Sequence, residues 1–379
     1  MKVFYAGSFD PFTYGHARVI EGALRKYDVV YVGIGINPDK ECMFSFDTRR
    51  IFIEEYFPED VKNGRLIVEP YEGLSVDKAI SVGADVLIRG IRSADDLIKE
   101  ECLAEANRTI ARVRGKKIET IYVHVEDEFL RTVSSSVVKK LCDEGEFIAT
   151  MRYVPPYVHS ALMAIYLKEI FFSLFKNSIN ASKTSKDKIF EMWDYLLTNY
   201  QNRKYHNLSH IAYMLNMLAI YKDKVVFKND LILAIFFHDV RMITNAEPSI
   251  NEWHSADVLG DFLAHISEYN GLHSYKAKDF IMATSHIDDF LNDEVAIIAD
   301  LDMAIMAAPY PKIWRWYEEG IRKEYSDASE QEYVKARKEF LLSVLDKPRI
   351  FHTQFFYDLF EEKARYNIKK QIKKYTDLE

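Results

Sequence analysis

The segment Tyr5-Ala6-Gly7-Ser8-Phe9-Asp10-Pro11-Phe12-Thr13-Tyr14-Gly15-His16 stands between a strand-like start, residues 2–5, and a helix-like run, residues 16–26. A strand-to-helix turn rich in glycine and hydroxyl side chains directs backbone N–H groups outward, where they can hold phosphate. A histidine at the mouth of such a turn adds a donor that can follow charge onto a phosphoryl oxygen. We therefore interpret this segment as a phosphate-binding turn, in preference to an ordinary turn that carries a surface histidine.

Outward from this turn, strand-like and helix-like stretches alternate through residues 1 to about 150. The strand-like stretches are rich in Val, Ile and Tyr, and they are nearly continuous in hydrophobicity. This pattern is typical of an α/β fold in which helices cover both faces of an open parallel sheet. The expected strands are Val3–Ala6, Val29–Ile36, Leu66–Pro70, Val86–Ile91 and Ile118–His124. The expected helices are Ala17–Lys26, Thr48–Phe57, Val76–Val82 and Asp95–Ile110.

Ligands of open parallel sheets bind at the carboxyl ends of the strands. Four candidate loops of this chain follow strand ends: residues 5–16, 37–44, 89–92 and the segment before Val133. We therefore expect these loops to converge on one rim of the sheet and to form a single site.

The first half of this rim has side chains that suit a phosphate chain. Ser8 and the backbone around Gly7 can contact phosphate, and His16 stands at the start of a helix. Lys40 is a mobile cation just past the second strand. The pattern Gly-x-x-x-x-Gly-Lys-Ser/Thr is absent from the sequence, which argues against a Walker-type kinase.

The other half of the rim adds two arginines and a run of hydroxyls. Arg89 and Arg92 flank Gly90 past another strand end, and guanidinium groups suit phosphate oxygens. Glu100, on the next helix, can hold an arginine or a ribose. Ser134-Ser135-Ser136 begins a helix, where the three hydroxyls serve either as N-caps or as a phosphate cradle.

The composition of the 379 residues favours a folded, well-packed soluble protein, which we expect in the cytoplasm. A net charge of −8 argues against nonspecific nucleic-acid binding, and three widely spaced cysteines indicate reduced thiols. The N-terminus runs directly into the first strand, so we expect no signal peptide. The apolar stretch Ala161–Phe175 contains Lys168 and Glu169 and is shorter than the ~20 residues that span a membrane, so we expect a packed helix there.

The second part of the chain has a different texture. After Pro156 strand signals largely vanish and helical periodicity takes over. The polar, serine-rich stretch Asn177–Lys188 is the best candidate for a linker. We therefore expect a first domain over residues 1–165, a helix and linker over 166–188, and an all-α domain over 189–379.

Histidines and carboxylates in the second part point to a metal. His238-Asp239 lies in an apolar helix-like run, and an ionisable pair is unfavourable to bury unless a partner or a metal compensates. His206 and His210 share one helical face at i, i+4. His286 and an Asp300-Leu301-Asp302 pair follow. Imidazoles mixed with carboxylates suit Fe, Mn, Zn, Co or Ni, so we expect a divalent transition metal.

Several blocks of the first part match a known family in order and spacing. These are Gly7-Ser8-Phe9-Asp10-Pro11, Gly15-His16, Pro38-Asp39-Lys40 with Met43-Phe44, Arg89-Gly90-Ile91-Arg92, Asn107-Arg108, Val133-Ser134-Ser135-Ser136-Val137-Val138-Lys139 and Val158-His159-Ser160-Ala161-Leu162-Met163-Ala164. On these blocks, residues 1 to about 165 resemble bacterial phosphopantetheine adenylyltransferase, the penultimate enzyme of coenzyme A synthesis. The resemblance implies a Rossmann-like sheet that joins ATP to 4′-phosphopantetheine, with Mg²⁺, giving dephospho-CoA and pyrophosphate. It also implies a homo-oligomer, the hexamer of that family.

The resemblance also implies roles for single residues, and His16, Lys40 and Arg92 are the expected catalytic positions. Ser8 and His16 would contact the ATP phosphates and the transition state, while Lys40 and Arg89 would hold the phosphate of phosphopantetheine. Arg92, Glu100 and the serines Ser134, Ser135 and Ser136 would serve ATP, and Ser75 falls at the pantetheine end. Phe9, inside the first block, is counted with the substrate-binding positions. Ser8 stands where the family more often has threonine, and residues 93–95 and 98–99 also depart from the family, which leaves the adenosine contacts open.

The expected reaction is direct in-line attack by an anionic phosphate oxygen, so no general base is needed and the protein supplies alignment and charge stabilisation. Another phosphate acceptor, such as nicotinate mononucleotide or glycerol phosphate, is the alternative.

The second part resembles the HD superfamily of metal-dependent phosphohydrolases over about 190–370, and within it an uncharacterised branch. The shared elements are Tyr205-His206-Asn207 with His210, Phe237-His238-Asp239, Asn251-Glu252 with Ser255-Ala256, Thr284 with His286, the Asp300/Asp302 pair, Ile321-Arg322 with Glu324-Tyr325, and Ala364-Arg365 with Asn367.

This second resemblance implies the metal ligands His210, His238, Asp239 and one aspartate, for which we favour Asp302 while Asp300 stays possible. His286 would bind a second metal or the substrate phosphate, and His206 would support a ligand. The implied chemistry is hydrolysis of a phosphoryl group by metal-activated water. Pyrophosphate, a pantetheine intermediate or a nucleotide is the hypothetical substrate. A non-catalytic nucleotide-binding regulator or an assembly scaffold is the alternative.

Overall fold

A computed structural model of this chain describes residues 1–36, 41–91, 94–124, 132–176, 183–221, 225–243, 249–266, 272–285, 293–309 and 312–377. Its backbone divides into two compact units, Met1–Val158 and His159–Glu379. The first unit thus ends before the limit of 165 that we expected. The assignment of functional domains to residues 1–165 and 189–379 stays a prediction, because these units are defined by compactness alone.

The first unit is built on one five-stranded parallel sheet with strand order β3-β2-β1-β4-β5. Its strands are β1 (Lys2–Gly7), β2 (Val29–Gly35), β3 (Leu66–Tyr71), β4 (Val86–Ile91) and β5 (Glu119–His124). The expected parallel sheet of an α/β fold is therefore confirmed, and the strand ends lie close to those expected from the sequence.

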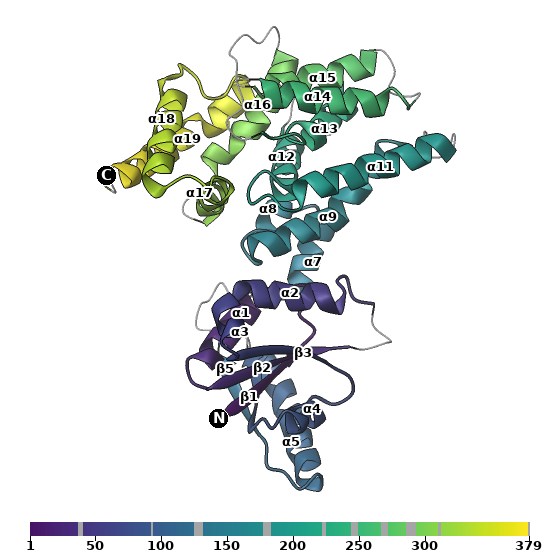
Figure 1. Cartoon of the computed structure of the whole chain (residues 1–379), viewed down its shortest axis with the longest axis vertical. Helices are drawn as coiled ribbons and strands as arrows, with labels where there is room; N and C mark the ends of the chain where they lie inside the picture. Colours follow the sequence, from purple (N-terminus) through teal and green to yellow (C-terminus); the bar gives the residue numbers. More distant parts are fainter. Residues whose placement is uncertain are drawn as a thin grey trace. The chain divides into compact units, whose positions relative to one another are not determined.

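Helices cover both faces of this sheet. The helices of this unit are α1 (Tyr14–Leu24), α2 (Phe46–Tyr56), α3 (Pro58–Lys62), α4 (Ser75–Ser81), α5 (Ala94–Val113), α7 (Ser135–Asp143) and α8 (Phe147–Thr150). Figure 1 shows α1, α2 and α3 on one face of the sheet, with α4 and α5 on the other. Buried side chains of β1, β4, α4 and α5 form the core on the second face. The short helices α3 and α8 had not been predicted.

The strand order determines where a ligand site can form. β1 lies between β2 and β4, and Tyr5 of β1 pairs with Ile88 of β4, so the carboxyl ends of β1 and β4 are side by side. The connections that follow these two strands lead to opposite faces, to α1 and α5. Such a switch point opens a crevice at the sheet edge, which is where open α/β sheets bind their ligands.

The second unit is helical throughout its described residues. After α9 (Pro156–Ser173), which begins just before the unit boundary, its elements are α11 (Lys183–Tyr200), α12 (Leu208–Ile220), α13 (Lys228–Phe237), α14 (Ile250–Leu263), α15 (Leu272–Ala283), α16 (Asp293–Met303), the 3₁₀ helix η2 (Ala304–Ala307), α17 (Lys312–Glu324), α18 (Glu330–Asp346) and α19 (Gln354–Thr376). The expected all-α architecture of this part is therefore confirmed.

Aromatic side chains make part of the core of the second unit. Phe171 of α9 contacts Trp193 of α11 and Phe236 of α13, with ring centroids 5.4 and 5.3 Å apart. All three side chains are almost fully buried. Helix α13 is apolar on nearly every side because its neighbours surround it, which also places His238, directly after it, in the interior. Among the described residues, no helix combines the length and apolar character that crossing a membrane requires.

The linker expected over residues 177–188 is in part wrong, because α11 begins at Lys183. Residues 177–182 lie outside the described residues. Ser185 and Ile189 are buried, while most of the lysines of this stretch are exposed, so its polar composition is that of the solvent face of an amphipathic helix.

Candidate active site and metal centre

The turn after β1 holds the imidazole of His16 in one orientation. Thr13 is the N-cap of α1, and its backbone N–H donates a hydrogen bond to His16 Nδ1 at 3.1 Å. A backbone N–H can only donate, so Nδ1 is the acceptor and the neutral ring carries its proton on Nε2. The ring also packs against Phe9 and Phe12, at centroid distances of 4.9 and 6.1 Å. This arrangement suits a donor toward a phosphoryl oxygen.

Phe9 packs against the ring of His16 and is fully buried. Its side chain also contacts Tyr5. The expected place of Phe9 among the substrate-binding positions stays a prediction, and the buried ring leaves any such contact to the backbone. Its φ of 50° is in the left-handed region, which a non-glycine residue adopts only where its surroundings require it. The neighbouring Ser8 is exposed at the surface of the turn.

Arg89 contacts two other residues that the sequence analysis singled out separately, Ser75 and Glu100. From β4 its guanidinium donates to Ser75 Oγ at 3.4 Å and pairs with a Glu100 oxygen at 3.3 Å. It also donates to the carbonyl oxygen of Ala6 at 3.2 Å, which ties β4 to the end of β1. The hydroxyl, the guanidinium and the carboxylate therefore form one chain of contacts at the carboxyl edge of the sheet.

A cavity of about 250 Å³ opens at this edge. Its lining comes from the ends of four strands and includes Ser8 and Arg89 together with Gly7, Gly35 and Tyr71. Backbone amides, a hydroxyl and a guanidinium in one hollow are suited to an anionic ligand. Lys40 and Arg92, which we expected at the same rim, lie outside the described residues.

The serines at the start of α7 divide into different roles. Ser134 caps the helix by accepting a hydrogen bond from the N–H of Val137 at 3.2 Å. Ser135 donates to the carbonyl oxygen of Pro11 at 2.8 Å, which fastens α7 to the turn after β1. Ser136 is exposed. The structure therefore gives Ser134 the capping role, one of the two that the sequence left open, and assigns Ser135 to positioning the turn.

The sequence analysis missed the residues whose hydrogen bonds and ion pair fix the turn after β1. Asp10, which is buried, accepts hydrogen bonds from the N–H groups of Met43 and Phe44, both at 2.9 Å, and pairs with Lys139 Nζ at 2.6 Å. Arg49, also buried, donates to the carbonyl oxygen of Ser8 at 2.7 Å. Asp10 and Lys139 lie inside blocks that match the family, so the sequence could have indicated them. Arg49 lies on an amphipathic helix, and nothing in the sequence indicated its role.

In the second unit, four side chains come together in the interior: one from α12, two from the residues directly after α13, and one from α16. Ligand atoms of His210, His238 and Asp239 all lie within 4.8 Å of one another. Asp302 Oδ1 is 3.0 Å from His210 Nε2, and Asp239 Oδ2 is 3.0 Å from His238 Nε2. Two imidazoles and two carboxylates therefore converge, as the favoured set of ligands from the sequence requires.

The hydrogen bonds of the two histidines leave the same ring atom for a metal. His238 Nδ1 lies 2.9 Å from the carbonyl oxygen of Ile235, so Nδ1 carries a proton, and in the neutral ring that a metal requires Nε2 keeps the lone pair. His210 Nδ1 contacts the hydroxyl of Tyr205 at 3.1 Å. Both Nε2 atoms are buried, and each lies 3.0 Å from a carboxylate oxygen, that of Asp302 for His210 and that of Asp239 for His238, in a geometry that does not make a hydrogen bond. A divalent cation would satisfy both, so this donor set fits a metal of the N/O-binding kind.

The charges of the cluster favour a bound cation as well. Burial alone would lower the pKa of His238, but the Asp239 carboxylate outweighs it and raises that pKa to about 9. Burial alone would raise the pKa of Asp239, but the imidazoles of His238 and His206 hold it well below its usual range. The carboxylate is thus ionised inside the protein and needs a positive partner, which a protonated imidazole or a metal can supply.

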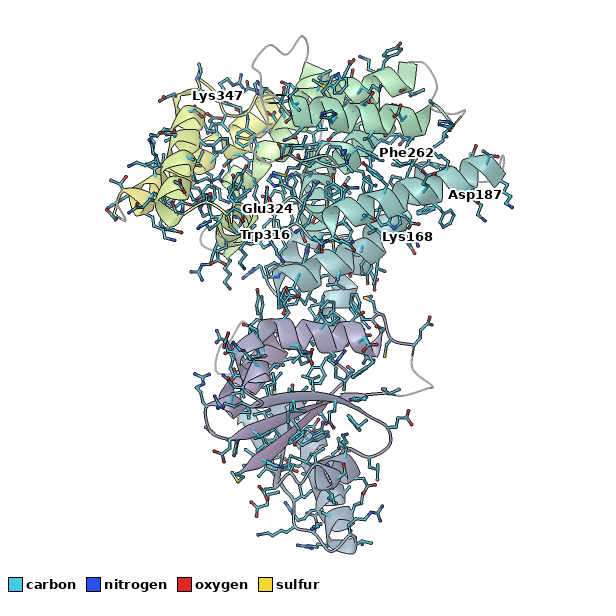
Figure 2. The ribbon with its side chains drawn as sticks, viewed as in Figure 1. Lys168, Asp187, Phe262, Trp316, Glu324 and Lys347 are labelled. Carbon is cyan, nitrogen blue, oxygen red and sulfur yellow. The ribbon has the colours of Figure 1, made fainter. Side chains whose placement is uncertain are left out.

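A second carboxylate fastens the segment that leads into this cluster. Glu324 Oε1 accepts hydrogen bonds from three successive N–H groups, those of Lys204, Tyr205 and His206, at 2.8 to 3.0 Å. Its other oxygen lies 2.6 Å from His206 Nδ1. Glu324 stands at the end of α17, the helix that also carries Trp316 (Figure 2). The Tyr-His-Asn and Arg-x-Glu elements, far apart in the sequence, therefore meet at one point.

Asp300 does not join the cluster. It is fully buried, and its two oxygens accept hydrogen bonds from the N–H of His352 and from the N–H and hydroxyl of Thr353, all at 2.7 Å. Its position corrects the possibility that Asp300 is a ligand, since these donors already occupy the carboxylate. His286, the other additional candidate, lies outside the described residues.

Comparisons with known proteins agree with the architecture of the first unit. A family model described as cytidylyltransferase-like matches residues 4–141. Phosphopantetheine adenylyltransferase of Chelativorans sp. strain BNC1 is 37% identical over 161 residues, which are 42% of this chain and 93% of that protein. The enzyme of the same name from Bacteroides thetaiotaomicron is 39% identical over 154 residues, 41% of this chain and 95% of that protein.

Among solved structures, a Plasmodium falciparum nicotinic acid mononucleotide adenylyltransferase complexed with NaAD is similar, with a TM-score of 0.32 and 16% identity over 45% of this chain and 95% of that one.

Proposed function

The N-terminal part of this chain belongs to the phosphopantetheine adenylyltransferase family of nucleotidyltransferases, and on that premise we propose that it joins ATP to 4′-phosphopantetheine. The products would be dephospho-CoA and pyrophosphate, and Mg²⁺ would accompany ATP. The observation that supports the proposal most strongly is the anion-suited cavity that Ser8 and Arg89 line at the carboxyl ends of the strands.

The side chains support a reaction that needs no general base, because the attacking phosphate oxygen is already anionic. The Nε2–H of His16 is directed by Thr13 and can donate to a phosphoryl oxygen as charge builds on it. Arg89, steadied by Glu100, offers its guanidinium to the phosphate of the acceptor. Lys40 and Arg92 complete the proposal as further cations.

The test is to incubate the full chain with ATP, Mg²⁺ and 4′-phosphopantetheine and to follow dephospho-CoA and pyrophosphate by chromatography. We expect both products in equal amounts. Parallel reactions with nicotinate mononucleotide and glycerol phosphate identify another acceptor if there is one. A larger kcat/KM with either of these acceptors would contradict the proposal for pantetheine.

We propose further that the helical part is a metal-dependent phosphohydrolase of the HD kind. Its support is the convergence of His210, His238, Asp239 and Asp302, in which the Nε2 atom of each histidine lies 3.0 Å from a carboxylate oxygen of the same cluster. These four residues would hold the ion, which, when bound, supplies a Lewis acid for a phosphoryl group and activates water. Glu324 holds the backbone of residues 204–206 and the imidazole of His206 in place.

Metal analysis of the purified full chain tests this second proposal. We expect about one equivalent of Fe, Mn, Zn, Co or Ni in the parent and its loss in His238→Ala. His265→Ala is the matched control, because His265 is exposed and lies outside the cluster. Phosphate release in the presence of each metal should follow the metal content. Equal metal content in all three proteins would favour the alternative of a regulatory or scaffold module.

A further inference from the structure

A cavity of about 400 Å³ adjoins the metal cluster of the helical unit. Asp302 and His206 form part of its wall, so it is continuous with the ligand set. Apart from Arg337, the rest of the wall is apolar and aromatic, with side chains such as Met306, Tyr317 and Phe340. Pockets for organic molecules of moderate size have volumes of about 300–1,000 Å³ and mostly apolar walls. An inorganic phosphate or pyrophosphate alone would leave most of this wall without a partner.

The basic side chains of the wall already have acidic partners. Arg337, which is largely buried, pairs with Glu318 at 2.9 Å, and its guanidinium also donates to the hydroxyl of Tyr317. His206 pairs with Glu324. A second phosphate group on the substrate would therefore meet no uncompensated cation among the described lining residues, and burying it there would be unfavourable.

Two buried polar atoms of the lining residues make no hydrogen bond within the described part of the chain, the hydroxyl oxygen of Tyr333 and Arg337 Nε. The Nε–H group of Arg337 needs an acceptor, because a buried donor left unsatisfied costs about 1–3 kcal/mol. The carbonyl oxygen of an amide or the acceptor edge of a nucleobase would meet that need without adding charge.

We propose that this cavity holds the uncharged alcohol part of a phosphate monoester whose phosphoryl group lies at the metal cluster. The proposal rests on the hydrolase function proposed above and selects among its substrates. It favours 4′-phosphopantetheine or a nucleoside monophosphate, which share an uncharged, acceptor-bearing alcohol. It disfavours pyrophosphate and dephospho-CoA, whose leaving groups are themselves anionic.

The reaction is hydrolysis and needs no further reactant. The oxygen of a water molecule forms a bond to phosphorus, and the ester P–O bond breaks. One proton of that water ends on the alcohol oxygen, and the other stays with the phosphate. The products are the neutral alcohol and inorganic phosphate, so the cavity wall never has to accommodate a charged leaving group.

The experiment uses the full chain, without ATP, so that adenylyl transfer cannot take place. Phosphate release is measured with Mn²⁺ from 4′-phosphopantetheine, AMP and pyrophosphate in the parent, Ala336→Trp and Lys335→Trp. Ala336 is exposed and lines the cavity, so an indole there fills the space without disturbing a buried position. Lys335, its exposed neighbour, is outside the lining and is the matched control.

Binding of pantetheine and of adenosine to the metal-free proteins is measured by calorimetry in the same three proteins. Any binding of these alcohols at the nucleotidyltransferase site is common to all of them, so a difference reports the cavity. We expect a monoester to be hydrolysed faster than pyrophosphate. We also expect kcat/KM for that monoester to fall at least about tenfold in Ala336→Trp and to stay unchanged in Lys335→Trp.

The outcomes separate this proposal from the one it rests on. Fast pyrophosphate hydrolysis, or equal monoester activity in Ala336→Trp, overturns the cavity assignment and leaves the hydrolase function standing. Absence of hydrolysis together with alcohol binding that only Ala336→Trp abolishes supports the occupant and overturns the hydrolase function. Absence of both hydrolysis and a binding difference overturns both.

Discussion

At the scale of single residues, the hydrogen bond from the backbone N–H of Thr13 to His16 Nδ1 decides which ring nitrogen carries the proton, and leaves Nε2–H as the donor for a ligand. Removing the imidazole of His16, and with it this donor, should affect the reaction and not the fold. We expect His16→Ala to lower kcat for dephospho-CoA formation by about 10²–10³-fold, the scale of losing one transition-state donor. Steady-state kinetics with ATP and 4′-phosphopantetheine measure this.

Thr13→Ala provides the contrast, because the backbone N–H that orients His16 remains while the cap of α1 is lost. It should cost about 0.5–2 kcal/mol of unfolding free energy with a far smaller effect on kcat. A parent-like rate in His16→Ala would show that the imidazole does not contact the reacting phosphate.

The two aspartates Asp300 and Asp302 show why the sequence alone left the fourth ligand open. Residues two apart on a helix point about 200° from each other, so only one of the pair can face the cluster. The apolar run at residues 303–306 favours Asp302 as the inward one, but Asp300 is also followed by an apolar residue and stayed possible. The structure resolves this through Thr353, whose N–H and hydroxyl occupy the Asp300 carboxylate.

A pair of substitutions separates these two roles. Asp302→Asn should lower metal content and leave the unfolding free energy close to that of the parent. Asp300→Asn should do the reverse, since an amide in place of a carboxylate faces an N–H donor with its own N–H₂ group. A loss of about 1–3 kcal/mol is expected there. Elemental analysis and urea unfolding measure the two effects, and the opposite pattern would exchange the assignments.

At the scale of elements, hydrophobic period and turn residues predicted the sheet well, because buried parallel strands are continuous apolar runs. The same reasoning failed at Lys183–Lys188, where a polar run is the solvent face of α11. Local composition cannot distinguish a linker from such a face, because the apolar residues that fix the helix, from Ile189 on, come later in the chain. The positioning role of Ser135 was equally hidden, since its partner Pro11 is 124 residues away.

Two glycines should respond to the same substitution with opposite sign. A Cβ at Gly33, in β2, would lie 2.2 Å from a ring carbon of Phe4 in the neighbouring strand, so Gly33→Ala should destabilise by about 1–3 kcal/mol. A Cβ at Gly22, in α1, would meet only Val123 at 3.7 Å. Gly22→Ala should therefore stabilise by about 0.5–1 kcal/mol. Denaturant unfolding of both variants tests the packing of sheet and helix, and destabilisation of equal size would contradict it.

The buried face of α7 makes a prediction about thiol chemistry. Burial raises the pKa of Cys142 to about 12, and the reactive form of a thiol is the thiolate. At pH 8 only roughly one Cys142 in 10⁴ is then ionised. Iodoacetamide should modify the exposed Cys102 and leave Cys142 untouched until urea unfolds the chain, as peptide mass spectrometry would show. Rapid alkylation of Cys142 in the native protein would mean that α7 does not pack as described.

At the scale of the whole molecule, two units each have a core and a site of their own. The first closes around its sheet, and the second around aromatic residues such as Trp193. The residues proposed for adenylyl transfer all come from the first unit, and those proposed to bind metal all come from the second. Neither set borrows a side chain from the other, which predicts that the two activities are energetically independent.

Single and double substitutions in the full chain measure this independence. Asp239→Asn should abolish metal binding and leave the rate of dephospho-CoA formation within about twofold of the parent, because effects at independent sites without shared partners add within about 0.5 kcal/mol. His16→Ala should leave the metal content unchanged. The double variant should then show the sum of the two single effects and nothing more. A fall in adenylyl transfer upon Asp239→Asn would instead require the metal centre to bias the shape of the nucleotidyltransferase unit, and metal titration of the parent would then change the KM for ATP.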